Sequence, residues 1–157
     1  MKRQIILGVT LAAFGAGMAI AEIAPENVEF TDGAIAQSLT GTAGNPEDGK
    51  KVFGTPALGN CVACHMSTVA KDIPFPGDVG PTLDGAADRW TEEQLRGIVA
   101  NAKMTFEGSM MPSFYKTTGY IRPGDAYTGK AGAEPLPPIL SGQQIEDVVS
   151  YLMTFKE

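Results

Sequence analysis

The sequence predicts a small all-α domain in which long irregular loops join a few short helices. Two capping boxes, Thr91 to Gln94 and Ser141 to Gln144, each stand before apolar residues at helical spacing. A third helix start is marked by Asn45-Pro46, an N-cap residue followed by proline. No strand–helix–strand pattern is evident between these starts, so we expect helices alone to form the core.

The first 21 residues have the pattern of a secretory signal peptide. They begin with two basic residues, continue with an apolar run and end in Ala19-Ile20-Ala21, an A-x-A cleavage site. The alternative is a membrane anchor, but the run is short for a bilayer span and several glycines interrupt it. We expect cleavage before Glu22 and export to the periplasm.

The mature chain would have 136 residues, with 10 basic and 18 acidic side chains and a net charge of −8. This size suits one domain. An acidic chain argues against nucleic acid and against anionic membranes as partners. No other stretch of the mature chain is long and apolar enough to span a membrane.

Residues 22–44 contain few periodic apolar positions, and we expect an extension that lies over the domain or a partner, outside the core. A disordered tail is the alternative. The domain itself is expected at 45–157. Its first helix begins after Asn45 and runs to about Phe53.

Two further helices are expected on either side of a long loop. The inward face of the helix after Thr91 is formed by Leu95, Ile98, Val99 and Ala102. Residues 107–140 are rich in glycine and proline, and a loop of this length is uncommon unless it is functional or disordered. The apolar stripe of the last helix is Ile145, Val148, Val149, Leu152 and Phe155.

The segment from Cys61 to His65 is a C-x-x-C-H motif, the pattern of covalent c-type haem attachment. Thiols at i and i+3 share one face of a turn, so Cys61 and Cys64 could both add to the vinyl groups of one porphyrin. Imidazole is the usual proximal ligand of haem iron. We interpret the two cysteines as thioether residues of one haem c and His65 as an axial ligand.

Two other uses of the motif are weaker. A thioredoxin-like thiol pair is expected in a βαβ setting, which is not evident here. A structural zinc site needs four ligands, and the chain has two cysteines and one histidine.

Because His65 is the only histidine, a second protein ligand to the iron would most commonly be a methionine sulfur. Setting aside the signal peptide, the residue after His65 and the last helix, three methionines remain: Met104, Met110 and Met111. We predict Met111, because Pro112 stiffens its loop. Met110 is the chief rival, and simple core packing of all three stays open.

These motifs resemble class I cytochromes c. The family has a first helix, C-x-x-C-H, G-P-x-L, Met-Pro and a last helix, matched here by Gly49/Phe53, 61–65, 80–83, 111–112 and Tyr151-Leu152. The resemblance implies the class I cytochrome c fold, with the two helices crossing closely at Gly49.

The resemblance also implies two further haem contacts. The carbonyl of Pro81 would accept the Nδ1 hydrogen of His65 and orient the ring. Arg89 would pair with a haem propionate, or it is a solvated charge beside a helix.

A longer similarity, over most of 45–157, is to the SoxX family of cytochrome subunits. It is carried by Gly80–Gly85, Arg89–Arg96, Asn101–Lys103, Met110–Phe114, Ile121–Gly124 and Leu136–Leu140. It implies a heterodimer with a SoxA-like cytochrome, acting as an L-cysteine S-thiosulfotransferase. The catalytic haem would be on SoxA, the thiosulfate acceptor would be a SoxYZ carrier cysteine, and a small cytochrome c would take the electrons.

The loop 113–140 and the extension 22–44 are candidate partner contacts, or else a lid over the chain's own haem edge. Three rival functions share parts of the pattern. They are a freestanding electron-transfer cytochrome c, a sensor cytochrome with an open iron site, and a haem-free thiol redox pair.

Overall fold

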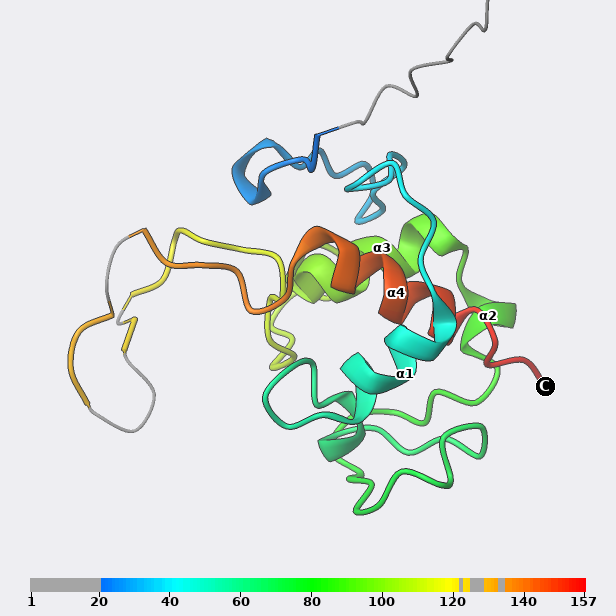
Figure 1. Ribbon diagram of the computed structural model, residues 1–157. Helices are drawn as coiled ribbons and strands as arrows, with labels where there is room; N and C mark the ends of the chain where they lie inside the picture. The colour runs from blue at the N-terminus through cyan, green and yellow to red at the C-terminus, as the bar shows by residue number, and fades with distance from the viewer. Residues whose placement is uncertain (1–20, 122, 125–128, 133–134) are drawn as a thin grey trace, which may run out of the picture.

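Figure 1 shows a computed structural model that describes residues 21–121, 123–124, 129–132 and 135–157. The proposed signal peptide, up to residue 20, lies outside the described residues, as does Arg122. The α-helices within them are α1 (Pro46–Gly54), α2 (Ala86–Arg89), α3 (Glu92–Asn101) and α4 (Gly142–Leu152), and the 3₁₀ turns are η1 (Pro25–Asn27), η2 (Cys61–Ala63) and η3 (Ala102–Met104). In that part of the chain β-structure is limited to two isolated bridges, Thr31–Ala34 and Gly124–Ala131. The all-α prediction is confirmed.

Each predicted helix start is present. Asn45 caps α1, its side-chain oxygen accepting hydrogen bonds from two backbone N–H groups of the first turn. The reciprocal capping boxes of Thr91 and Ser141 open α3 and α4. These caps satisfy N–H groups that a helix leaves without intrahelical partners, so the helix positions were readable from local sequence.

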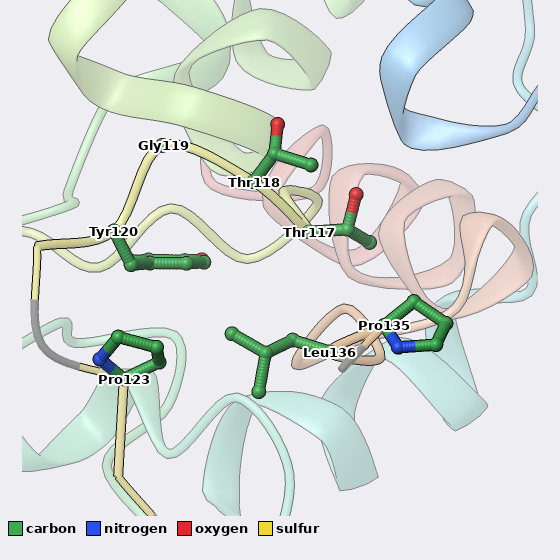
Figure 2. Close-up of a pocket in the computed structure, with 7 residues that line it drawn as sticks. All are labelled: Thr117, Thr118, Gly119, Tyr120, Pro123, Pro135 and Leu136. Atoms are coloured by element: carbon green, nitrogen blue, oxygen red, sulfur yellow. The ribbon is translucent and has the colours of Figure 1, made fainter. Parts of the chain in front are cut away.

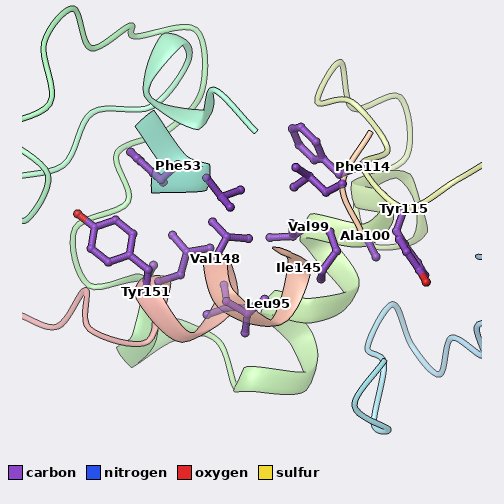
Figure 3. Packing of buried hydrophobic residues seen from close by; sticks show 14 of the residues in the cluster. Phe53, Leu95, Val99, Ala100, Phe114, Tyr115, Ile145, Val148 and Tyr151 are labelled. Atoms are coloured by element: carbon purple, nitrogen blue, oxygen red, sulfur yellow. The ribbon is translucent and has the colours of Figure 1, made fainter. Parts of the chain in front are cut away.

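Helix α4 forms the centre of the domain, packing against α1 and α3. The five residues of its predicted stripe are all buried, and Figure 3 shows side chains of the three helices meeting there. At Gly49 a Cβ atom would collide with the carbonyl of Asp147 on α4. The absent side chain therefore allows α1 and α4 to cross at backbone contact.

The extension before α1 is more integrated than expected. Ile35 and Leu39 are fully buried members of the core, so the prediction that 22–44 lies outside the core is wrong at these positions. Backbone pairing explains their placement. The N–H of Ile35 donates to the carbonyl of Glu93 at 3.0 Å, and that of Leu39 donates to the Glu146 carboxylate at 2.7 Å.

A buried ion pair, which no local sequence pattern predicted, joins α3 to α4. Arg96 donates through Nε to both carboxylate oxygens of Glu146, at 3.0 and 3.1 Å. The same guanidinium donates to the carbonyl of Ile35 at 2.9 Å and to Glu92 at 2.6 Å. One charged network thus holds α3, α4 and the extension together.

The long loop after η3 is fixed at both ends. Tyr115 N–H donates to the carbonyl of Ala100, and Leu140 N–H donates to the carbonyl of Phe114, both at 3.0 Å. Between these anchors the chain leaves the body as an arm, yellow to orange in Figure 1. We refer to the described residues of 116–139 as the arm.

Candidate functional site

The C-x-x-C-H motif forms a tight turn. Cys61–Ala63 is the 3₁₀ turn η2, and the N–H groups of Cys64 and His65 both donate to the carbonyl of Cys61, at 3.1 and 3.0 Å. Side chains at i and i+3 eclipse in such a turn, so the geometry suits two thiols facing one flat group. Cys61 is half-buried and Cys64 is exposed, and both are free of disulfides.

The environment of Cys61 disfavours a thiol redox pair. Burial raises the pKa of the Cys61 thiol to about 12. Redox-active cysteines have lowered pKa values, because the thiolate is the reacting form. A thiol that stays neutral at physiological pH is poorly suited to disulfide exchange.

The imidazole of His65 is held in a defined orientation. Its Nδ1 lies 2.8 Å from the carbonyl oxygen of Pro81. Because a carbonyl only accepts hydrogen bonds, Nδ1 carries the hydrogen and Nε2 keeps its lone pair. The ring packs on Gly80, where a Cβ atom would come within 2.6 Å of Nδ1. This is the tautomer that an iron ligand requires, and with the two thiols it fits a covalently attached haem.

The segment that carries Pro81 is tied to its surroundings by side chains. The Asp84 carboxylate accepts hydrogen bonds from Ser67 Oγ at 2.8 Å and from the N–H and Oγ1 of Thr68 at 2.7 and 3.0 Å. These bonds, the Ser67 hydroxyl first, hold the pKa of Asp84 below its usual value. These bonds therefore favour the charged form of the carboxylate over the protonated one.

The guanidinium of Arg89 donates hydrogen bonds to the same segment. Its Nη1 donates to the carbonyl of Asp84 at 2.6 Å, and its Nη2 lies 3.4 Å from that of Thr82. Neither of the two interpretations of Arg89 predicted these hydrogen bonds, because every residue has a backbone carbonyl and the sequence does not mark which one accepts. A propionate contact for Arg89 stays a prediction.

Among the candidate methionines, Met111 is the best anchored. Its backbone carbonyl accepts a hydrogen bond from Lys103 Nζ at 2.7 Å, and its N–H lies 3.3 Å from Ser109 Oγ. Its side chain is half-buried against the core, whereas Met110 is 79% exposed. The described part of the candidate site is thus formed by η2 and the segment 80–84, and ligation by Met111 stays a prediction.

A separate pocket lies within the arm (Figure 2). It is lined by Thr117, Thr118, Gly119, Tyr120, Pro123, Pro135 and Leu136. It includes no predicted haem contact. Over the described ranges no helix is long and apolar enough to cross a membrane, and no three His, Cys, Asp or Glu side chains gather to hold a metal ion.

Comparison with known proteins gives two findings. The family model described as Cytochrome c matches residues 46–156. A chain of the crystal structure of SoxXA from P. pantotrophus is similar, with 63% sequence identity and a TM-score of 0.85. The match covers 87% of this chain and 100% of that one. No curated protein sequence matched.

Proposed function

This chain belongs to the cytochrome c family, and we propose that it is the electron-transfer cytochrome subunit of a SoxXA complex. The observation that carries the proposal is the match to a whole chain of a SoxXA structure at 63% identity. Family membership means that the chain carries covalently bound haem c. The two thiols on η2 and the oriented His65 are suited to hold it.

Haem c, when bound, supplies a one-electron couple. In the proposed site Cys61 and Cys64 would hold the porphyrin by thioether bonds, and His65 Nε2 and the Met111 sulfur would be the protein ligands of the iron. An iron ligated by both side chains would leave no position for substrate, so the role we propose for this subunit is electron transfer and not thiosulfate binding.

The proposed reaction is the oxidative coupling of thiosulfate to a cysteine of a SoxYZ carrier. A sulfur–sulfur bond forms between the carrier thiol and thiosulfate, and a proton and two electrons are released. The bond-forming step belongs to the SoxA-like partner. The subunit described here takes the electrons one at a time and passes them to a small cytochrome c in the periplasm.

The arm is the segment that we assign to the partner contact. It leaves the body (Figure 1) and carries the side chain of Ile121, which is 97% exposed. A single exposed apolar side chain is ordinary on a protein surface, so the support for a contact is the projection of the arm, and Ile121 is a side chain that a partner would cover. We propose that the arm contacts the SoxA-like subunit, and that the long loop, unnecessary in a freestanding carrier, exists for this purpose.

The first test is a visible spectrum of the purified chain, oxidised and reduced, followed by co-expression with a SoxA-type subunit. The proposal requires a c-type spectrum, a sulfur-to-iron band in the oxidised form, and thiosulfate oxidation that depends on both chains. A normal spectrum without a stable complex would leave the alternative, a freestanding electron-transfer cytochrome. Ready CO binding would instead indicate a sensor, and a colourless protein would indicate a thiol pair.

The arm is tested by Ile121→Asp. This change should weaken the complex and leave the spectrum intact. Phe75→Asp is the matched control, since Phe75 is an equally exposed apolar residue, at 91%, that lies outside the arm. Equal affinities of the two variants for the partner would contradict the role given to the arm.

A further inference from the structure

Two stretches of chain run side by side next to His65. The N–H of Gly80 donates to the carbonyl of Cys64 at 2.8 Å, and that of Leu83 donates to the carbonyl of Met66 at 3.0 Å. The first stretch carries the histidine, and the second carries the Pro81 carbonyl that receives its Nδ1 hydrogen. The geometry of that hydrogen bond therefore depends on how the two stretches are held together.

Asp84 links the two stretches at the end that lies beyond the Leu83–Met66 hydrogen bond. One carboxylate oxygen accepts three hydrogen bonds from the opposite stretch, from Ser67 Oγ and from the N–H and Oγ1 of Thr68. The distances are between 2.7 and 3.0 Å. Hydrogen bonds to a charged acceptor are about twice as strong as neutral ones. Among the described residues, Asp84 is the only carboxylate that accepts a hydrogen bond from either stretch.

The histidine has little freedom to absorb a movement of this segment. Its ring lies against the backbone of Gly80, at a distance that leaves no room for a Cβ atom, and Nδ1 is 2.8 Å from the next carbonyl. A displacement of the segment 80–84 by a few tenths of an ångström would therefore either press on the ring or lengthen the hydrogen bond.

We propose that Asp84 is a positioning residue that holds the Pro81 carbonyl against His65 and so sets the electron donation of the imidazole to the iron. The inference rests on the proposed ligation by His65. A strong hydrogen bond from Nδ1 makes the ring a more basic ligand. A more basic ligand favours the ferric state and lowers the reduction potential. Loss of the Asp84 bonds should weaken both effects.

The test is Asp84→Ala in the haem-loaded protein, read out by the reduction potential and by NMR exchange of the His65 Nδ1 hydrogen. We expect a higher potential and severalfold faster exchange. Asp84→Asn keeps an acceptor oxygen without the charge, so it should restore part of both values. Ser67→Ala removes one of the three bonds, and it should shift both readouts in the same direction by less.

The control is Asp72→Ala. Asp72 also lies in the loop after the haem motif, but its carboxylate pairs with Lys50 of α1 at 2.6 Å and does not touch either stretch. It should change neither readout. If Asp84→Ala does not give loaded protein, Ser67→Ala decides. An unchanged potential with unchanged exchange would overturn the inference, and so would a lower potential.

Failure of the inference is distinguishable from failure of the proposed function. A wild-type protein without the His/Met spectrum would refute the ligation itself. A wild-type protein with that spectrum, and variants that do not differ from it, would refute only the role of Asp84.

Discussion

Replacing Glu146 by alanine should cost this protein a large part of its folding free energy. The Glu146 carboxylate is 3% exposed and its partner Arg96 is 4% exposed. Besides Arg96, the carboxylate accepts hydrogen bonds from the N–H of Leu39 at 2.7 Å and from Ser38 Oγ at 3.1 Å. The substitution would leave a buried guanidinium without its main counter-charge and a buried N–H without an acceptor.

Removing one partner of a buried ion pair typically costs about 3–5 kcal/mol. A domain of ordinary stability has only about 5–15 kcal/mol in total. With a slope of about 2 kcal/mol per M, the urea midpoint of Glu146→Ala should fall by about 2 M. On these ranges the change removes about a fifth or more of the stability, and it alters none of the predicted haem contacts.

The double variant Arg96→Met/Glu146→Leu separates the charge from the packing. Apolar residues of similar size often replace a buried pair without loss. Here the Leu39 N–H stays without an acceptor, so a residual loss of about 1–3 kcal/mol is expected. Lys51→Ala is the surface control. Its ion pair with Asp48 is mostly exposed, and its loss should leave the midpoint nearly unchanged.

Unfolding would be followed in urea by far-UV circular dichroism and by emission of Trp90, the single tryptophan. Coincident transitions would justify a two-state treatment. A loss under about 1 kcal/mol for Glu146→Ala would refute the reasoning, because it would mean that water reaches the pair and screens it. A double variant less stable than Glu146→Ala would refute the division between charge and packing.

Three further predictions concern ligation, helix crossing and titration. Met111→Ala should abolish the sulfur-to-iron absorption band and lower the reduction potential, while Met110→Ala should leave both intact; the reverse result would exchange their roles. Gly49→Ala should force α1 and α4 apart and lower the free energy of unfolding in urea by about 3 kcal/mol. Gly124→Ala is the control and should be neutral, because a Cβ atom there would have no neighbour closer than 3.6 Å. Equal urea midpoints for the two variants would contradict close crossing of the helices. Burial and the adjacent carboxylate raise the pKa of Tyr115. The neutral phenol should therefore stabilise the fold fully below about pH 10, and this stabilisation should be lost as the pH rises beyond it. Ionisation of Tyr115 near pH 10 in a ¹³C NMR titration of the folded protein would contradict this.

Local patterns in the sequence were sufficient for the starts of α1, α3 and α4 and for the haem motif, whereas the short α2, which no side chain caps, was not predicted. Caps act within three residues of the helix they begin, and two thiols at i and i+3 with an adjacent histidine need no distant partner to be recognised. The contact between His65 and Pro81 came from family resemblance, and the observed distance of 2.8 Å agrees with it. Ligation by Met111 stays a prediction, although Lys103 and the core give it the better anchorage.

Only the tertiary structure decided which polar and apolar residues far apart in the chain meet. Leu39 and Glu146 are 107 positions apart, and Arg96 and Glu146 are 50 apart. Nothing in the residues around them marks a buried charge, because the solvent is excluded by elements that come together only in the fold. For the same reason, the core positions of the extension and the hydrogen bonds of Asp84 could not be predicted from the sequence. Sequence periodicity reports which face of one element is apolar, whereas burial depends on what another element places over that face.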